Sequence, residues 1–277
     1  MQKSVSLLGR KSYILSNGLK IHIPTVNEIR GGSDHDQTAY FQLITPFVCT
    51  STDFMVELHD KGVNFQDFSD DFTFTASLIM ASKDETDYSR LFECVKDCYF
   101  DVVEDADSNV YILDRQNEIL INREMYEEIS AVLCKMYFRE KKHRKFSNKL
   151  SYEKAVEFEK KKIERAKRNK QEFDMDSLIL FAVCTDGFKY NFESIGELSV
   201  YDFYSSIRQI QKSEHVDNLF LGGYTGNVDL TKIATDELNK FQKSDVQITI
   251  ELSGSLPNKN IFSLKFSYIA YKTDVAN

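Results

Sequence analysis

The fold is decided most clearly by one stretch of the chain, Asn122-Arg-Glu-Met-Tyr-Glu-Glu-Ile-Ser-Ala-Val-Leu-Cys-Lys-Met-Tyr137. Its apolar side chains recur three and four residues apart, the spacing that places side chains on one face of a helix. They are Met125, Ile129, Val132, Leu133, Met136 and Tyr137. Asn122 precedes them, and an Asn at this position accepts a hydrogen bond from a backbone amide of the first turn. The stretch therefore predicts a helix with one face buried in a core.

Two β-hairpins are predicted upstream of this helix. In residues 110–121, the runs Tyr-Ile-Leu and Glu-Ile-Leu-Ile flank a polar turn at Asp114–Asn117. Nearer the N-terminus, two short β-prone runs in residues 12–23 flank Asn17-Gly18, and Asn-Gly is the strongest short signal for a hairpin.

Helices are predicted for most of residues 25–100. Thr25-Val-Asn-Glu28 matches a capping box, which opens a short helix that ends at Gly31-Gly32. Further helices are expected around residues 37–48, 52–60, 67–80 and 86–100. The apolar residues of the last of these fall on one stripe and predict a core-facing helix; they are Tyr88, Leu91, Phe92, Val95 and Tyr99.

The second half of the chain predicts two more helices and a final hairpin. An apolar stripe that starts at Met175 ends at Gly187, and Ser199-Val-Tyr-Asp202 resembles a capping box for a helix through about Lys212. We expect the glycines at 222, 223 and 226 to break the chain. Apolar residues then alternate with polar ones in residues 246–252 and 262–268, which predicts a C-terminal β-hairpin.

These elements predict a mainly α fold of the α+β type, with a helical body and hairpins near the N-terminus, in the middle and at the C-terminus. We divide the chain into four parts. They are an acidic helical domain with hairpins over 1–138, a basic helical linker over 139–173, a second helical part over 174–245 and the C-terminal hairpin over 246–277.

The charge of the chain is divided unevenly. Residues 139–170 hold fourteen Lys or Arg against five Glu, a net charge of +9, whereas the remaining residues sum to −17. Residues 53–107 alone hold fifteen Asp or Glu against four Lys or Arg. A net charge of −8 for the whole chain argues against a surface built for nucleic acid.

The basic segment has three interpretations. A nucleic-acid arm fits its charge but not its scarcity of aromatic residues. A membrane-surface helix would need a continuous apolar face, which the segment lacks. We favour a solvated helix or hinge that contacts an acidic protein surface. The candidate partner-binding residues are Lys141, Lys142, Arg144, Lys145, Lys160, Lys161, Lys162, Arg165, Lys167 and Arg168.

No motif with catalytic chemistry stands out in the sequence. The glycines around 222–226 lack the Lys and the spacing of a phosphate loop, and no nucleophile elbow is present. Asp105-Ala-Asp-Ser-Asn109 copies the start of an EF-hand loop, but Val110 stands where that loop needs Gly. The five cysteines lack the partners of a zinc site, although Cys94 and Cys98 would share a helix face. We therefore expect no enzyme, no metal and no cofactor.

The chain also lacks an apolar run of about 20 residues that would span a bilayer, and its first residues do not form a signal peptide. We expect a cytoplasmic protein. The odd number of scattered cysteines is typical of reduced thiols.

Several stretches resemble the tail assembly chaperone type proteins of long-tailed phages and prophages of Gram-positive bacteria. They are Leu19-Lys-Ile-His-Ile-Pro-Thr-Val-Asn-Glu-Ile29, Asp53-Phe-Met-Val-Glu-Leu-His-Asp-Lys-Gly-Val-Asn-Phe65, Met175-Asp-Ser-Leu-Ile179, Tyr190-Asn-Phe-Glu-Ser-Ile195, Leu198-Ser-Val-Tyr-Asp-Phe-Tyr204, Ile207-Arg-Gln-Ile-Gln-Lys212 and Gly223-Tyr-Thr-Gly-Asn-Val-Asp229. The resemblance spans about residues 10–240, and the hairpin expected after Asp245 departs from it.

The resemblance implies a non-catalytic protein of the bacterial host cytoplasm, which binds the tape measure protein, keeps it in solution and recruits tail tube subunits. The sequence leaves two alternatives open: a structural virion component of the tail or baseplate, and a nucleic-acid-binding accessory protein that uses the basic segment. We expect protein partners, with a homo-oligomer among the options, and neither nucleic acid nor membrane as the main partner.

Overall fold

The structure is a computed structural model, and it describes residues 6–31, 34–64, 66, 87–94, 97–104, 110–114, 116–168, 175–235 and 237–239. These residues form seven α-helices and two small antiparallel sheets, so the predicted α+β fold with a helical body is confirmed. The helix predicted at 67–80, the EF-hand-like turn at 105–109 and the C-terminal hairpin at 246–277 lie outside the described residues.

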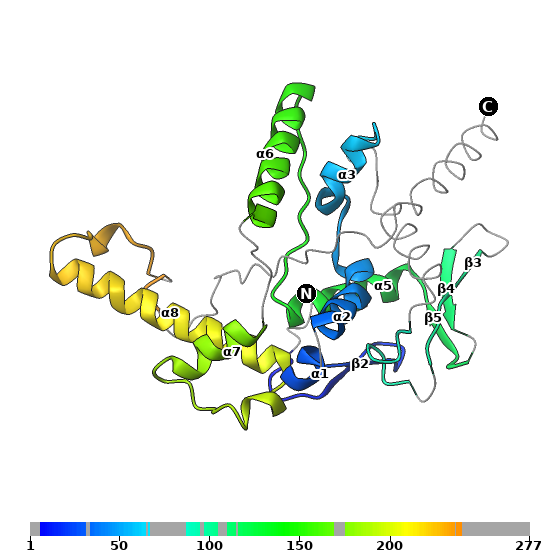
Figure 1. The fold of residues 1–277 in the computed structure, drawn as a ribbon, viewed down its shortest axis with the longest axis horizontal. Helices are drawn as coiled ribbons and strands as arrows, with labels where there is room; N and C mark the ends of the chain where they lie inside the picture. The colour runs from blue at the N-terminus through cyan, green and yellow to red at the C-terminus, as the bar shows by residue number, and fades with distance from the viewer. Residues whose placement is uncertain are drawn as a thin grey trace.

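The elements follow one another in the order shown in Figure 1. The strands are β1 Ser12–Ile14, β2 Lys20–His22, β3 Asp101–Glu104, β4 Val110–Asp114 and β5 Ile119–Ile121. The α-helices are α1 Val26–Arg30, α2 Asp34–Val48, α3 Met55–Asp60, α5 Arg123–Met136, α6 Lys149–Arg168, α7 Met175–Cys184 and α8 Val200–Tyr224. Short 3₁₀ helices are η1 Ser51–Phe54, η3 Ile195–Glu197 and η4 Leu230–Lys232.

The first hairpin and the capping box are confirmed. Tyr13 pairs with Ile21 in the antiparallel β1–β2 ladder, and Asn17 accepts a hydrogen bond from the Leu19 amide at 2.9 Å in the turn. At the start of α1, the Thr25 hydroxyl accepts from the Glu28 amide at 3.2 Å, and the Glu28 carboxylate accepts from the Thr25 amide at 2.6 Å. Each bond satisfies an amide that the first turn of a helix leaves free.

The second hairpin is confirmed and gains a third strand. β4 pairs with β5 as predicted, and β3 adds to the other edge of β4, which gives the order β3-β4-β5. Asn122 caps α5 by accepting from the Met125 amide at 2.9 Å. The apolar face of α5 is buried as its spacing predicts.

The helix predicted over 86–100 is wrong. Residues 87–94 and 97–100 form turns and extended backbone, although Leu91 and Phe92 are buried as expected. Their amides donate to the Tyr88 carbonyl within one turn, and the segment then pairs with the N-terminal hairpin, where the His22 amide donates to the Leu91 carbonyl at 2.9 Å. The Asp87 carboxylate accepts from the Cys98 amide at 2.9 Å and holds the two ends of the turn together. Tertiary pairing and a local side-chain acceptor therefore replace the helical bonds.

The helix predicted to end near Lys212 is twice as long as expected, because α8 continues through Gly222 and Gly223 to Tyr224. The two glycines do not break it. A Cβ atom at Gly222 would lie 2.6 Å from Val228 Cγ2, and one at Gly223 would lie 2.5 Å from Leu230 Cδ1. The missing side chains make room for the returning loop and η4, which pack against the end of α8.

One continuous core joins most elements. Its buried side chains run from Leu7 to Ile207 and include residues of α2, α5, α7 and α8. The Gly9 amide also donates to the Asp202 carboxylate at 3.1 and 3.2 Å and thus ties the start of the described chain to the first turn of α8. The predicted domain boundaries stay a prediction.

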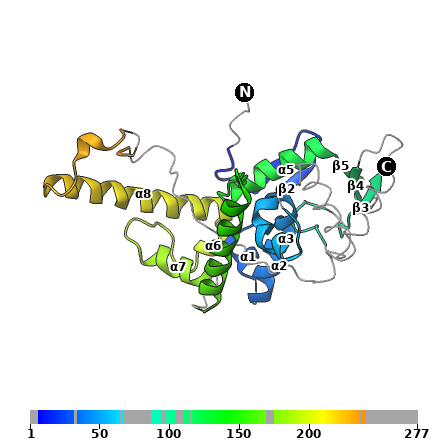
Figure 2. The same cartoon turned by 90° about the horizontal axis from the view of Figure 1, so that it is seen from above.

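Two helices extend from this body. α8 reaches away from the side of the body opposite the β3–β5 sheet, and α6 stands beside α3 (Figures 1 and 2). Among the described residues, no helix is long and apolar enough to cross a membrane.

Candidate protein-binding surfaces

The basic segment folds back onto the acidic part of the chain through a small apolar contact. Val156 of α6 packs with Met55 and Leu58 of α3 in a small cluster of its own, and Phe54 packs against both this cluster and the main core. The ring of His59 meets the ring of Tyr152 edge-on, with 5.6 Å between centroids. Among the described residues, these contacts lie on one side of α6.

Ion pairs reinforce the same contact. Lys160 pairs with Asp60 of α3, and its hydrogen bond is the first cause of a pKa of Asp60 below the ordinary value. Ahead of α6, Arg139 pairs with Asp53 at 2.9 Å, with both side chains four-fifths buried. The basic segment is therefore in part a strut on the acidic helices rather than a detached arm.

The ten candidate partner-binding residues differ in their contacts. Three of them contact other parts of the chain: Lys141 lies over the ring of Tyr126 at 5.4 Å, Arg144 pairs with Glu159 at 3.0 Å, and Lys160 pairs with Asp60. Lys161 pairs within α6 to Glu157 at 2.6 Å.

The other candidates are mostly at the surface. The exposed ones are Lys142, Lys145, Lys162, Arg165 and Arg168. Lys167 lies in α6, but its side chain is outside the described part of the structure. The role of these residues in partner binding stays a prediction.

Among the described residues, no group of His, Cys, Asp and Glu side chains is arranged to hold a metal ion. Cys94 and Cys98 do not share a helix face, because residues 87–94 and 97–100 are not helical. All five cysteines carry free thiols, and burial raises the pKa of Cys49 to about 12.

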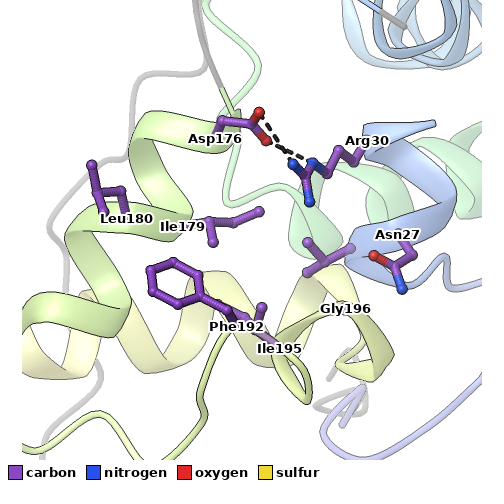
Figure 3. A pocket seen from close by; sticks show the side chains of 9 residues that line it. Asn27, Arg30, Asp176, Ile179, Leu180, Phe192, Ile195 and Gly196 are labelled. Carbon is purple, nitrogen blue, oxygen red and sulfur yellow. Dashed lines mark hydrogen bonds and ion pairs between the residues drawn. The ribbon is translucent and has the colours of Figure 1, made fainter. Parts of the chain in front are cut away.

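A second surface, which the sequence did not predict, is a groove of about 430 Å³ between α1, α7 and the loop before η3. Figure 3 shows Ile179 and Phe192 pointing toward one another across it, with Leu180 at its outer edge. Arg30 and Asp176 close one side through a two-point ion pair, 2.7 Å from Nε to Oδ1 and 3.3 Å from Nη2 to Oδ2. The floor is apolar and the rim is charged.

Gly196 of η3 lies against the side chain of Asn27 on α1. A Cβ atom at Gly196 would lie 2.3 Å from Nδ2 of Asn27, so a larger residue would require the Asn27 side chain to move. Just before it, the Asn191 side chain accepts from the amides of Glu193 at 3.1 Å and Ser194 at 2.9 Å. This turn leaves Phe192 at an exposed corner.

Large apolar side chains are exposed around the groove. Leu180 is 55% exposed and Phe192 is 61% exposed, and Phe181 and Tyr190 lie nearby in sequence and are also exposed. Exposed apolar side chains that form a contiguous patch mark binding surfaces more often than single ones do, and Leu180 and Phe192 both line this groove. A sequence signal existed: Leu178-Ile-Leu-Phe181 makes α7 apolar on every side, and such a helix must be covered all round.

Residues 167–245 match a family model described as the YomV second domain. This is a phage- or prophage-type family, and the matched residues include α7, the loop beside the groove, η3, α8 and η4. No curated protein and no solved structure matches the chain. The similarity in this segment indicates a phage-associated protein.

Proposed function

We propose that the protein is a non-catalytic phage tail morphogenesis factor, a tail assembly chaperone that binds the tape measure protein and tail tube subunits in the host cytoplasm. Two similarities support this proposal. One is the resemblance of residues 10–240 to tail assembly chaperone type proteins, and the other is the match of residues 167–245 to a phage-type family.

The observation that carries the proposal is the exposed apolar groove inside the matched segment. A client with long amphipathic helices needs an apolar surface that receives side chains from one helix face. The groove offers Ile179, Ile195 and Phe192 for that purpose, with the Arg30–Asp176 pair at its rim. The net charge of −8 would help to keep such a complex in solution.

Co-expression with the tape measure protein of the same phage tests the proposal. With the wild-type chain, we expect the tape measure protein to move into the soluble fraction and to copurify. A variant with Leu180→Asp and Phe192→Asp should lose this effect, because two carboxylates would enter the apolar contact. Leu221→Asp is the control, since Leu221 is 61% exposed on α8, away from the groove.

Two results would contradict the proposal. The first is a tape measure protein that stays insoluble with the wild-type chain, and the second is equal rescue by the groove variant and the control. Mass spectrometry of purified virions separates the alternative of a structural tail or baseplate component, because a chaperone should be absent from mature particles.

A further inference from the structure

The side of α6 that faces away from α3 carries an arrangement of its own. Leu150, Lys154, Phe158, Lys161 and Arg165 follow one another at spacings of three and four residues and therefore share one face of the helix. Val156, which packs on α3, lies on the opposite face. We call these five residues the outer face of α6.

The apolar side chains of α6 are distributed in an unexpected way. The contact with α3 is made by a valine and an alanine together with Tyr152, whereas Phe158 is 66% exposed and Leu150 is 62% exposed on the outer face. A helix that packs on one side against the described part of the chain should place its largest apolar side chains on that side. Their outward position indicates that a partner covers the outer face.

The charges on this face define the partner. Lys154 and Arg165 are exposed and make no salt bridge within the described part of the chain, and Lys161 pairs only with Glu157 of its own helix. The inner side of α6 shows how this helix contacts protein: Lys160 pairs with Asp60 while Val156 packs between apolar side chains of α3. α6 thus already holds one acidic helix by combining a cation with an apolar contact.

We propose that the outer face of α6 binds an acidic amphipathic helix of a protein partner. Phe158 inserts into the apolar stripe of that helix, and Lys154, Lys161 and Arg165 pair with carboxylates beside the stripe. Duplex DNA offers no apolar stripe for Phe158, and a lipid surface calls for a continuous apolar face that two side chains two turns apart do not supply. This inference does not depend on the tail assembly proposal.

The test measures fluorescence anisotropy of a labelled synthetic helix with the full-length chain. The probe is a capped peptide of about 21 residues, long enough to be helical, with leucines at heptad a and d positions and glutamates beside them. A second peptide has glutamine in place of each glutamate, and a third has the same composition in scrambled order. We expect the glutamate peptide to bind at least about tenfold more tightly than the other two at low salt.

Variants locate the binding. K161E/R165E and F158A should each weaken binding of the glutamate peptide by about tenfold or more, since an aromatic anchor and its charged neighbours dominate such contacts. K149E/K232E changes the net charge equally at two lysines whose side chains are 86% and 82% exposed, neither of them on the outer face, and should stay within about twofold of wild type. Circular dichroism verifies that the variants fold alike.

Three outcomes would overturn the proposal. The first is equal binding of all three peptides, and the second is an equal loss in K161E/R165E and K149E/K232E. The third is tighter, outer-face-dependent binding of duplex DNA or of phosphatidylglycerol vesicles, which would assign the face to nucleic acid or to membrane.

Discussion

The main core and the α3–α6 contact stabilise the chain on very different scales. The core connects side chains from Leu7 to Ile207 across most elements, whereas the fully buried side chains of the α3–α6 contact in the described residues are Met55, Leu58 and Val156. A large shared core makes its elements unfold together, and a small contact at its edge can open alone. The difference implies that α6 can leave the body while the body stays folded.

The largest expected effect is in the core. Phe92 is fully buried, and its ring meets those of Phe47 at 6.2 Å and Phe100 at 5.8 Å. Phe92→Ala should lower the free energy of unfolding by about 3–5 kcal/mol, because it leaves a cavity in the core. Urea denaturation measures this, and Phe158→Ala, the same truncation on exposed α6, should stay within about 0.5 kcal/mol of wild type. A similar loss of unfolding free energy in Phe92→Ala and Phe158→Ala would show that the main core and α6 do not differ in their contribution to stability.

Acid should weaken the sheet beside the core. Burial by itself would raise the pKa of Asp114, but hydrogen bonds from the Asn117 side chain, the Cys98 thiol and backbone amides hold it below its ordinary value. A lowered pKa means that the charged carboxylate contributes stability above the unfolded pKa of about 3.9, and that this is lost as pH falls through the folded pKa.

Asp114→Asn tests this contribution. The variant should be less stable than wild type at pH 7 by about 1.5–3 kcal/mol, the range for hydrogen bonds to a charged group. Urea denaturation at pH 7, 4 and 3 should show the gap narrowing as pH falls. If the difference in free energy of unfolding between the variant and wild type is the same at every pH, the charge of Asp114 does not contribute to stability.

Val156→Asp should detach α6 and leave the body intact. Lys160, one turn further along α6, already pairs with Asp60, so a carboxylate between Met55 and Leu58 should drive the helix off rather than be buried. We expect amides of residues 149–168 to lose hydrogen-exchange protection, while global unfolding changes by less than about 1 kcal/mol. Equal loss of protection in α5 would show that α6 belongs to the cooperative core.

The smallest effect is expected at Glu57 on α3. Burial raises the pKa of Glu57, and one of its oxygens is buried without a hydrogen bond in the described structure. A raised pKa favours the protonated form in the folded chain, so the associated stability is present at low pH and lost as pH rises through the folded pKa. Glu57→Gln should therefore stabilise the protein by a few tenths of a kcal/mol at pH 7, with the gain vanishing near pH 4 in thermal melts.

The turns and helix caps could be predicted from the sequence, because each is formed by residues that are neighbours in the chain. Thr25 with Glu28, Asn17-Gly18 and the Asn122 cap each act within four residues, and all are confirmed. The two helix predictions that were wrong lie where contacts with residues far away in the chain compete with local helix formation. Leu91 pairs with the N-terminal hairpin instead of continuing a helix, and Gly223 receives a loop side chain instead of ending one.

For the binding surfaces too, local features could be predicted from the sequence and contacts between distant residues could not. The sequence located the basic segment by its charge, but only the structure separates residues that pair with the body, such as Lys160, from those on the outer face, such as Arg165. The apolar side of the groove had a signal in Leu178–Phe181, but its rim could not be predicted, because Arg30 and Asp176 are 146 residues apart in the chain and meet only in the fold.

The bond between Gly9 and Asp202 has a consequence for synthesis of the chain. These two residues are separated by 193 positions, and Leu7 shares a core with Ile207. At 5–20 residues per second, a ribosome needs about 10–40 s between making the first and the second of each pair. During that interval the part of the core that α8 completes stays open, so the contacts of Leu7 and Gly9 with α8 can form only after α8 has emerged from the ribosome.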